Sequence, residues 1–182
     1  MCIPARADIM EPCSCALSTV TKYQKRISGP LLDRIDIHIE VPRVDYEKLS
    51  GDRLGETSEA IRQRVQAARE RQLARFSNSD SRNANIVSNA DMRVAEIRQF
   101  CQLDDQSQSL MRSAMTQLNL SARAYHRILK LARTIADLAG SEEIQSVHLA
   151  EALHLRSSEI DDRVIEVLTQ KYRGLSVVAQ GL

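Results

Sequence analysis

Hydrophobic residues recur at helical spacing through most of the chain after Thr57, and the strongest such pattern lies between residues 121 and 140. Its apolar positions step by alternating fours and threes, the spacing of an amphipathic helix. Ser121 is a favourable N-cap before this run, and Gly140 is a favourable residue to end it. We therefore predict a long helix over 121–140. Its buried face is expected to hold Ala124, Ile128, Leu131, Ile135 and Leu138.

The same spacing predicts helices over 58–75, 91–100 and 105–118, and a last helix capped by Ser141. The stretch 77–88 is rich in Asn and Ser, which predicts a loop. Four or five helices joined in this way predict a small bundle, and the tail 157–182 is expected to hold one more helix around 161–172. The residues expected on or near the buried side of the shorter helices are Ile61, Val65, Ala68, Leu110, Ala114, Leu118, Val147, Ala150, Leu153 and His154.

One segment has the period of a strand instead. Ile35, Ile37, Ile39 and Val41 alternate with polar residues, directly after a turn at Gly29-Pro30. No other segment is a comparable strand, and a lone strand leaves its backbone groups without partners. This strand is therefore expected either to belong to a sheet completed by residues outside the chain or to be an unstable remnant.

Composition favours a helical protein without a membrane span. The chain of 182 residues is 43% hydrophobic, 27% charged and only 3% aromatic, and no apolar run approaches the roughly 20 residues that cross a bilayer. A net charge of +1 means that any contact with nucleic acid must come from local basic patches. Four cysteines, three of them within the first fifteen residues, do not make a disulfide framework, and we expect a cytoplasmic location.

Two separate stretches carry a family resemblance. The first runs through Ser28-Gly-Pro-Leu-Leu-Asp-Arg-Ile-Asp-Ile37, and the second begins Leu120-Ser-Ala-Arg-Ala-Tyr-His-Arg127. Both resemble the Mg-chelatase-related AAA+ ATPases of the ComM/YifB type, and the resemblance covers roughly 19–156. It implies a mainly α fold, an AAA+ C-terminal helical lid bundle preceded by a turn and one strand left from the α/β ATPase core. The segments expected are a divergent Cys-containing segment (1–18), the end of the core (19–50), the lid (57–156) and the tail (157–182).

The resemblance also gives roles to two arginines. It implies that Arg34 is the arginine finger, which reaches the γ-phosphate bound by a neighbouring subunit, where a guanidinium suits the spread of transition-state charge. The alternative is local pairing of Arg34 with Asp33 or Asp36. It implies that Arg123 is the sensor-2 residue, which contacts the nucleotide of its own subunit. Arg123 lies in a first helical turn, where a phosphate would offset the unfavourable helix dipole, and the alternative is a solvated arginine.

Arg127 and Lys130 follow Arg123 on the same side of the predicted helix. Such a row suits phosphates of nucleotide or DNA, but it is equally typical of a solvated face. The basic residues of 58–75 alternate with Glu59 and Glu70, which favours a salt-bridged surface over a nucleic-acid groove.

Several chemistries have no support in the sequence. The chain has no Gly-x-x-x-x-Gly-Lys-Ser/Thr loop and no apolar strand ending in paired acids, so we expect no ATPase activity from it alone. Members of the family carry a Cys-rich insertion that could bind zinc, but Cys2, Cys13 and Cys15 lack a fourth ligand and free thiols are favoured. The four histidines share no metal-ligand spacing and are expected to be structural. These are His38, His126, His148 and His154.

The resemblance implies the rest of the function. The complete protein would form a homo-hexamer in which this part contacts the ATPase core and neighbouring subunits, hydrolyse ATP with Mg, and act on DNA in branch migration or competence. The alternative class is a non-enzymatic helical module that binds DNA or protein through the basic face of the helix over 121–140. Salt-dependent DNA binding by the chain alone would favour that alternative.

Overall fold

The computed structural model describes residues 16–24, 26, 31, 34–39, 55–77 and 86–156. The predictions for Cys2, Cys13 and Cys15, for the Gly29-Pro30 turn, for most of the loop over 77–88 and for the tail after Arg156 lie outside these residues. Two compact units are distinguished. The N-terminal unit comprises Met1–Ile35 and Ile39–Gly55, and the helical unit comprises Asp36–His38 and Glu56–Leu182.

The N-terminal unit contains one described helix, α1 (Leu17–Gln24). The sequence pattern did not predict it, because the segment is short and most of its residues are polar. Later in the unit, the backbone N–H of Arg34 donates to the carbonyl of Leu31 (3.0 Å), which closes a turn before the predicted strand.

The predicted strand is not formed within residues 35–39, which have no regular secondary structure. Ile35, Ile37 and Ile39 are 39%, 47% and 70% exposed. A strand takes its backbone hydrogen bonds from a neighbour, and the described part of the chain contains no second strand to supply them. The mainly helical fold is confirmed, but the predicted strand is not formed in this segment.

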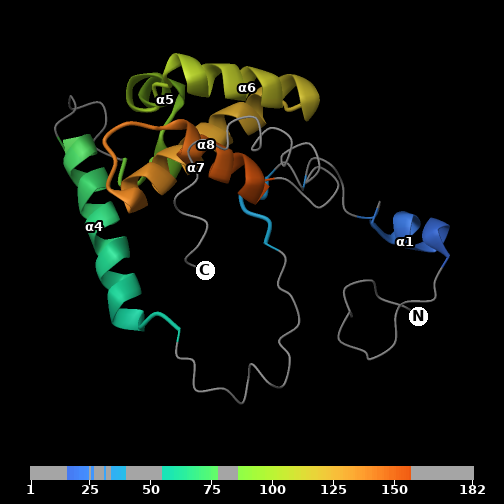
Figure 1. Ribbon diagram of the computed structural model, residues 1–182, viewed down its shortest axis with the longest axis horizontal. Helices are drawn as coiled ribbons and strands as arrows, with labels where there is room; N and C mark the ends of the chain where they lie inside the picture. Colours follow the sequence, from blue (N-terminus) through green and yellow to red (C-terminus); the bar gives the residue numbers. More distant parts are fainter. Residues whose placement is uncertain are drawn as a thin grey trace. The chain divides into compact units, whose positions relative to one another are not determined.

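The helical unit consists of α4 (Ser58–Ser77), a 3₁₀ turn η2 (Asn89–Asp91), α5 (Val94–Phe100), α6 (Asp105–Gln117), α7 (Ala122–Ala139) and α8 (Ser146–Arg156). Helix α7 packs against α8, α4, α5 and η2, and α6 packs against α8. Figure 1 shows α5 and α6 above α7 and α8, with α4 extending away from the bundle. The predicted small bundle is therefore confirmed, with α7 at its centre.

The core lies where α5, α6, α7 and α8 meet. Leu110, Ile128 and Leu149 are among its largest fully buried side chains. The rings of Phe76 and Phe100 pack edge to face with centroids 5.7 Å apart, and they join the end of α4 to this core. No described helix is long and apolar enough to cross a membrane.

Two details of the helix predictions were wrong. Ser141 does not cap the last helix, since α8 begins at Ser146, and the Ser141 hydroxyl donates to the Glu143 carbonyl (2.7 Å). The buried face of α7 is also broader than the predicted one, although Ala124, Ile128 and Ile135 are buried as expected. Leu138 is 38% exposed, whereas Ala132 and Ala136 are fully buried, because several elements pack against α7.

Candidate functional site

The ends of α7 are set by the residues that the sequence indicated. The Ser121 hydroxyl accepts a hydrogen bond from the backbone N–H of Ala124 (3.2 Å), as an N-cap should. Gly140 has φ of 77°, and its N–H donates to the carbonyl of Asp137 (3.2 Å). Glycine reaches this left-handed conformation without a steric penalty, which explains why the helix ends there.

Arg123 is exposed in the first turn of α7. That turn contains no acidic residue, and within the described residues no hydrogen bond or ion pair engages the guanidinium of Arg123. The backbone N–H groups at a helix start carry partial positive charge, so a cation here is unfavourable unless an anion joins it. The start of α7 therefore suits a phosphate or carboxylate.

Arg127 and Lys130, which follow Arg123 on the same side of α7, both contact polar groups of the chain itself. Arg127 Nε lies 3.2 Å from Asp36 Oδ1, and Lys130 Nζ donates to the carbonyl of Ala90 (2.7 Å). Asp36 also accepts from Arg156 Nη1 (3.4 Å). The structure thus brings Arg127 to Asp36, and it joins α7 to η2 through Lys130.

Arg34 is exposed in the N-terminal unit, two residues before Asp36 in the sequence. Asp33, one of its alternative local partners, lies outside the described residues. The other alternative partner, Asp36, contacts Arg127 and Arg156. The role of Arg34 stays a prediction.

The basic side chains of α4 divide into two groups. Near its start, Arg62 pairs with Glu59 (3.6 Å) and Arg64 with Glu56 (3.1 Å), as expected of a salt-bridged surface. Near its end, Arg71 and Arg75 contact α7; Arg71 stays exposed, but the side chain of Arg75 is 16% exposed, so the prediction of a surface role was wrong for Arg75. The predicted burial of Ile61 and Val65 was wrong as well, since they are 41% and 45% exposed.

Asp137 on α7 is the centre of a buried polar cluster. Its carboxylate is fully buried and accepts from Arg133 Nη2 (2.9 Å) and Nε (3.1 Å) and from Asn89 Nδ2 (2.8 Å). Arg75 donates to both carboxylate oxygens, with Nη1 at 2.9 Å from Oδ2 and Nη2 on Oδ1. Burial alone would raise the pKa of Asp137, but the hydrogen bonds from Arg75 and Asn89 and the charges of Arg133 and Arg75 outweigh it and lower the pKa.

The same cluster ties the ends of several elements together. Arg133 also donates to the carbonyls of Ser141 and Glu142 (2.7 Å each), and Arg71 donates to the carbonyl of Asp137 (2.9 Å). It therefore holds α4, η2 and the connection after α7 to one carboxylate. Sequence reasoning missed the cluster. Its one local signal is the opposite charges of Arg133 and Asp137 at i,i+4 within an otherwise apolar part of the helix.

Two other titratable groups are buried near this cluster. Burial raises the pKa of the free thiol of Cys101 to about 12. Burial, and next the charge of Arg133, lowers the pKa of His148, whose Nδ1 accepts from the backbone N–H of Gln145 (3.1 Å). Among residues 55–77 and 86–156 and the other described residues, no group of three His, Cys, Asp or Glu side chains could hold a metal ion.

Comparison with known proteins places this chain in a family. The family described as magnesium chelatase, subunit ChlI C-terminal, matches residues 55–156, the range that contains α4 to α8. The chain belongs to this magnesium chelatase ChlI family. A second match, to magnesium chelatase, subunit ChlI, covers residues 2–49, which include Arg34.

Individual relatives of this ChlI-family chain agree with that assignment. It is 44% identical over 140 residues to the competence protein ComM of Haemophilus influenzae, covering 76% of this chain and 26% of that protein. It is 40% identical over 144 residues to the uncharacterised protein YifB of Escherichia coli, covering 79% and 27%. The predicted ComM/YifB resemblance is confirmed, and the chain spans about a quarter of the length of these curated relatives.

Proposed function

We propose that this chain is the C-terminal part of an ATP-hydrolysing ring protein of the ComM/YifB type, and that it supplies Arg34 as arginine finger and Arg123 as sensor-2 residue. The proposed segments are 1–18, 19–50 with the finger, 57–156 as the lid and 157–182 as the tail. The observation that carries the proposal is the exposed Arg123 in the first turn of α7, within a chain that matches the ChlI C-terminal family.

Electrostatics supports the role of Arg123. A cation in the first turn of a helix works against the helix dipole, and no acid in that turn offsets it. A nucleotide phosphate would reverse this balance, because it would accept hydrogen bonds from the guanidinium and from the helix start together. Arg123 would therefore bind a nucleotide phosphate more strongly as the negative charge on that phosphate increases.

The sequence supports a division of labour between this chain and a P-loop domain. The chain contains no P-loop and no paired acids after an apolar strand, so ATP phosphates and Mg would be held elsewhere. When present, Mg-ATP supplies the phosphoryl group. The residues of this chain would orient and neutralise it, with Arg123 acting in its own subunit and Arg34 on a neighbour of a homo-hexamer.

DNA is the proposed substrate class, on the strength of the similarity to a protein named for competence. The alternative of a separate DNA-binding module has less support. Helix α7 is the central helix of the bundle, and the side chains of Arg127 and Lys130 bind groups within the chain. Direct phosphate contacts by Arg127 and Lys130 stay predictions.

Mixing experiments in a complete protein with its P-loop domain test the two roles. Arg34→Ala should lower turnover by roughly 10³-fold while sparing nucleotide affinity, since a finger stabilises transition-state charge. A subunit lacking only its P-loop Lys should restore activity to Arg34→Ala, because hybrid interfaces combine an intact P-loop with an intact finger. The subunit that lacks its P-loop Lys should not rescue Arg123→Ala. In that mixture every ATP site lacks either the sensor arginine or the P-loop Lys of its own subunit.

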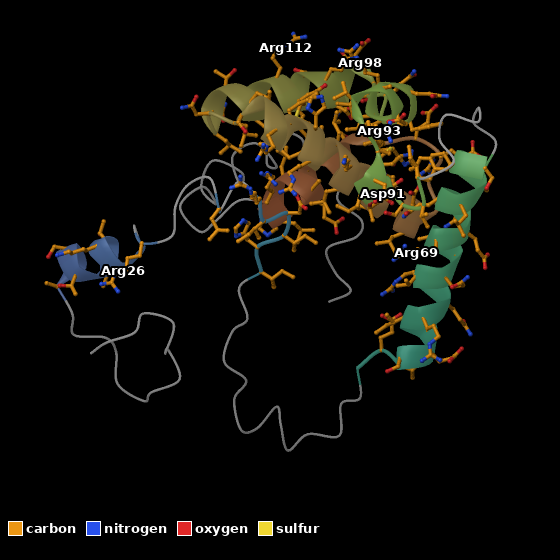
Figure 2. All side chains as sticks on the ribbon, turned by 180° about the vertical axis from the view of Figure 1, so that it is seen from behind. Arg26, Arg69, Asp91, Arg93, Arg98 and Arg112 are labelled. Atoms are coloured by element: carbon orange, nitrogen blue, oxygen red, sulfur yellow. The ribbon has the colours of Figure 1, made fainter. Side chains whose placement is uncertain are left out.

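The matched control is Arg112→Ala, which removes an exposed arginine on the outer side of α6 (Figure 2) and should leave turnover unchanged. Equal rescue of the Arg34 and Arg123 variants would refute the assignment of one residue to the neighbouring site and the other to its own. Magnesium-dependent turnover by this chain alone, abolished by Arg123→Ala, would refute the division of labour.

A further inference from the structure

The segment Asp36–His38 is held to the bundle at two points. Asp36 Oδ1 lies 3.2 Å from Arg127 Nε of α7 and 3.4 Å from Arg156 Nη1 of α8. Two residues on, the backbone N–H of His38 donates to the carbonyl of Leu155 (2.7 Å). The Asp36 side chain is 49% exposed and that of Arg127 is 30% exposed, whereas that of Arg156 is only 7% exposed.

Each contact satisfies a group that the helices leave open. Leu155 is in the last turn of α8, where carbonyls have no partner within the helix, so the N–H of His38 caps that end. Arg156 is in the same turn, where a cation suits the helix dipole, and Asp36 balances its charge. One carboxylate thus lies within 3.4 Å of two guanidinium groups that come from two different helices.

We propose that Asp36, Arg127 and Arg156 form a clamp that attaches the segment Asp36–His38 to α7 and α8 and couples it to the finger; the coupling rests on the proposed function of Arg34 and Arg123. Arg34 precedes Asp36 by two residues, and Arg123 precedes Arg127 by one helical turn. A helix moves as a rigid element, so a nucleotide that draws Arg123 also moves Arg127 and the segment attached to it. Arg127 and Arg156 are therefore positioning residues. They transmit the nucleotide state of one subunit to Arg34 of that subunit, which acts at the ATP site of the neighbouring subunit.

Hydrogen exchange in this chain tests whether the clamp exists. Asp36→Asn removes both ion pairs, and we expect the protection of the His38 amide to fall about threefold to tenfold, the size expected for two partly exposed pairs. Arg127→Gln should give a smaller fall, and the double variant should match Asp36→Asn. The controls are Asp105→Asn and Arg112→Gln, exposed positions on α6 that should leave the His38 amide unchanged. Unchanged protection in Asp36→Asn would overturn the clamp.

Turnover in the complete protein tests the coupling. Asp36→Asn and Arg127→Gln should each lower kcat severalfold at unchanged KM for ATP, and a subunit lacking its P-loop Lys should rescue them as it rescues Arg34→Ala. Weaker nucleotide or DNA binding by Arg127→Gln with unchanged kcat would overturn the positioning role and make Arg127 a ligand contact. Full turnover by Arg34→Ala would instead refute the finger and the coupling to it, while His38 exchange would still decide whether the clamp exists.

Discussion

Replacing Asp137 by Asn should strongly destabilise the bundle. The substitution keeps the shape of the side chain but puts an NH₂ group, a donor, where a carboxylate oxygen now accepts. The Arg133 side chain, only 3% exposed, and the Arg75 side chain, 16% exposed, would lose the negative charge with which both of them pair. Removing one partner from a buried ion pair typically costs about 3–5 kcal/mol. A domain of this size has about 5–15 kcal/mol of stability in all, so the loss is a large share.

Urea unfolding followed by far-UV circular dichroism measures this loss directly. With an m-value of about 1.5 kcal/mol/M, the midpoint of Asp137→Asn should fall by roughly 2–3 M. The matched control Asp105→Asn changes an exposed acid in the first turn of α6 and should cost no more than about 1 kcal/mol, the size of a helix-dipole contribution. In an Arg75→Gln background, Asp137→Asn should cost less, because contacting residues couple by about 0.5–3 kcal/mol. A loss below about 1 kcal/mol would refute the idea that this carboxylate holds α4 to α7.

Three further predictions follow from single groups. The lowered pKa of Asp137 adds stability that is fully present above the pKa of an unfolded Asp, about 4, and is lost as pH falls through the pKa in the folded state. Acid should therefore lower the urea midpoint less in Asp137→Asn than in the parent. Gly140→Ala should cost about 1 kcal/mol in urea unfolding, because φ is 77° and the new Cβ would lie 3.3 Å from Arg71 Nη2; an unchanged midpoint would contradict this. Cys101, with its pKa raised to about 12, should react with iodoacetamide at pH 8 only after unfolding, and peptide mass spectrometry that finds rapid native labelling would disprove it.

The boundaries of α7 could be predicted because their causes are local. Ser121 caps the helix through a residue three positions ahead, and Gly140 ends it through its own backbone conformation. The family could be recognised for a similar reason, since its two motifs are continuous in the sequence. Helix α6 was likewise predicted from its own apolar spacing, and Leu110 and Ala114 are buried as expected.

The strand and the start of α8 were predicted less well because their signals depend on partners. The alternation through Ile35 and Ile37 is a strand pattern, but a strand also needs a neighbour to accept its hydrogen bonds, and the described residues provide none. Ser141 resembles a cap, but its backbone N–H donates to the carbonyl of Ala136 in the turn that ends α7. Its own carbonyl accepts a hydrogen bond from Arg133.

The sequence by itself determined most of the helical unit, both ends of α7 and the family, because hydrophobic period and capping chemistry act over three or four residues. Only the tertiary structure decided which charges are internal. Arg62 and Arg75 belong to one basic helix, yet Arg62 meets a neighbour in the same helix at the surface, while Arg75 meets Asp137 from 62 residues away. The partner of a buried charge depends on which distant helices pack together. No local pattern could therefore separate the arginine that faces solvent from the one that holds α4 to the bundle.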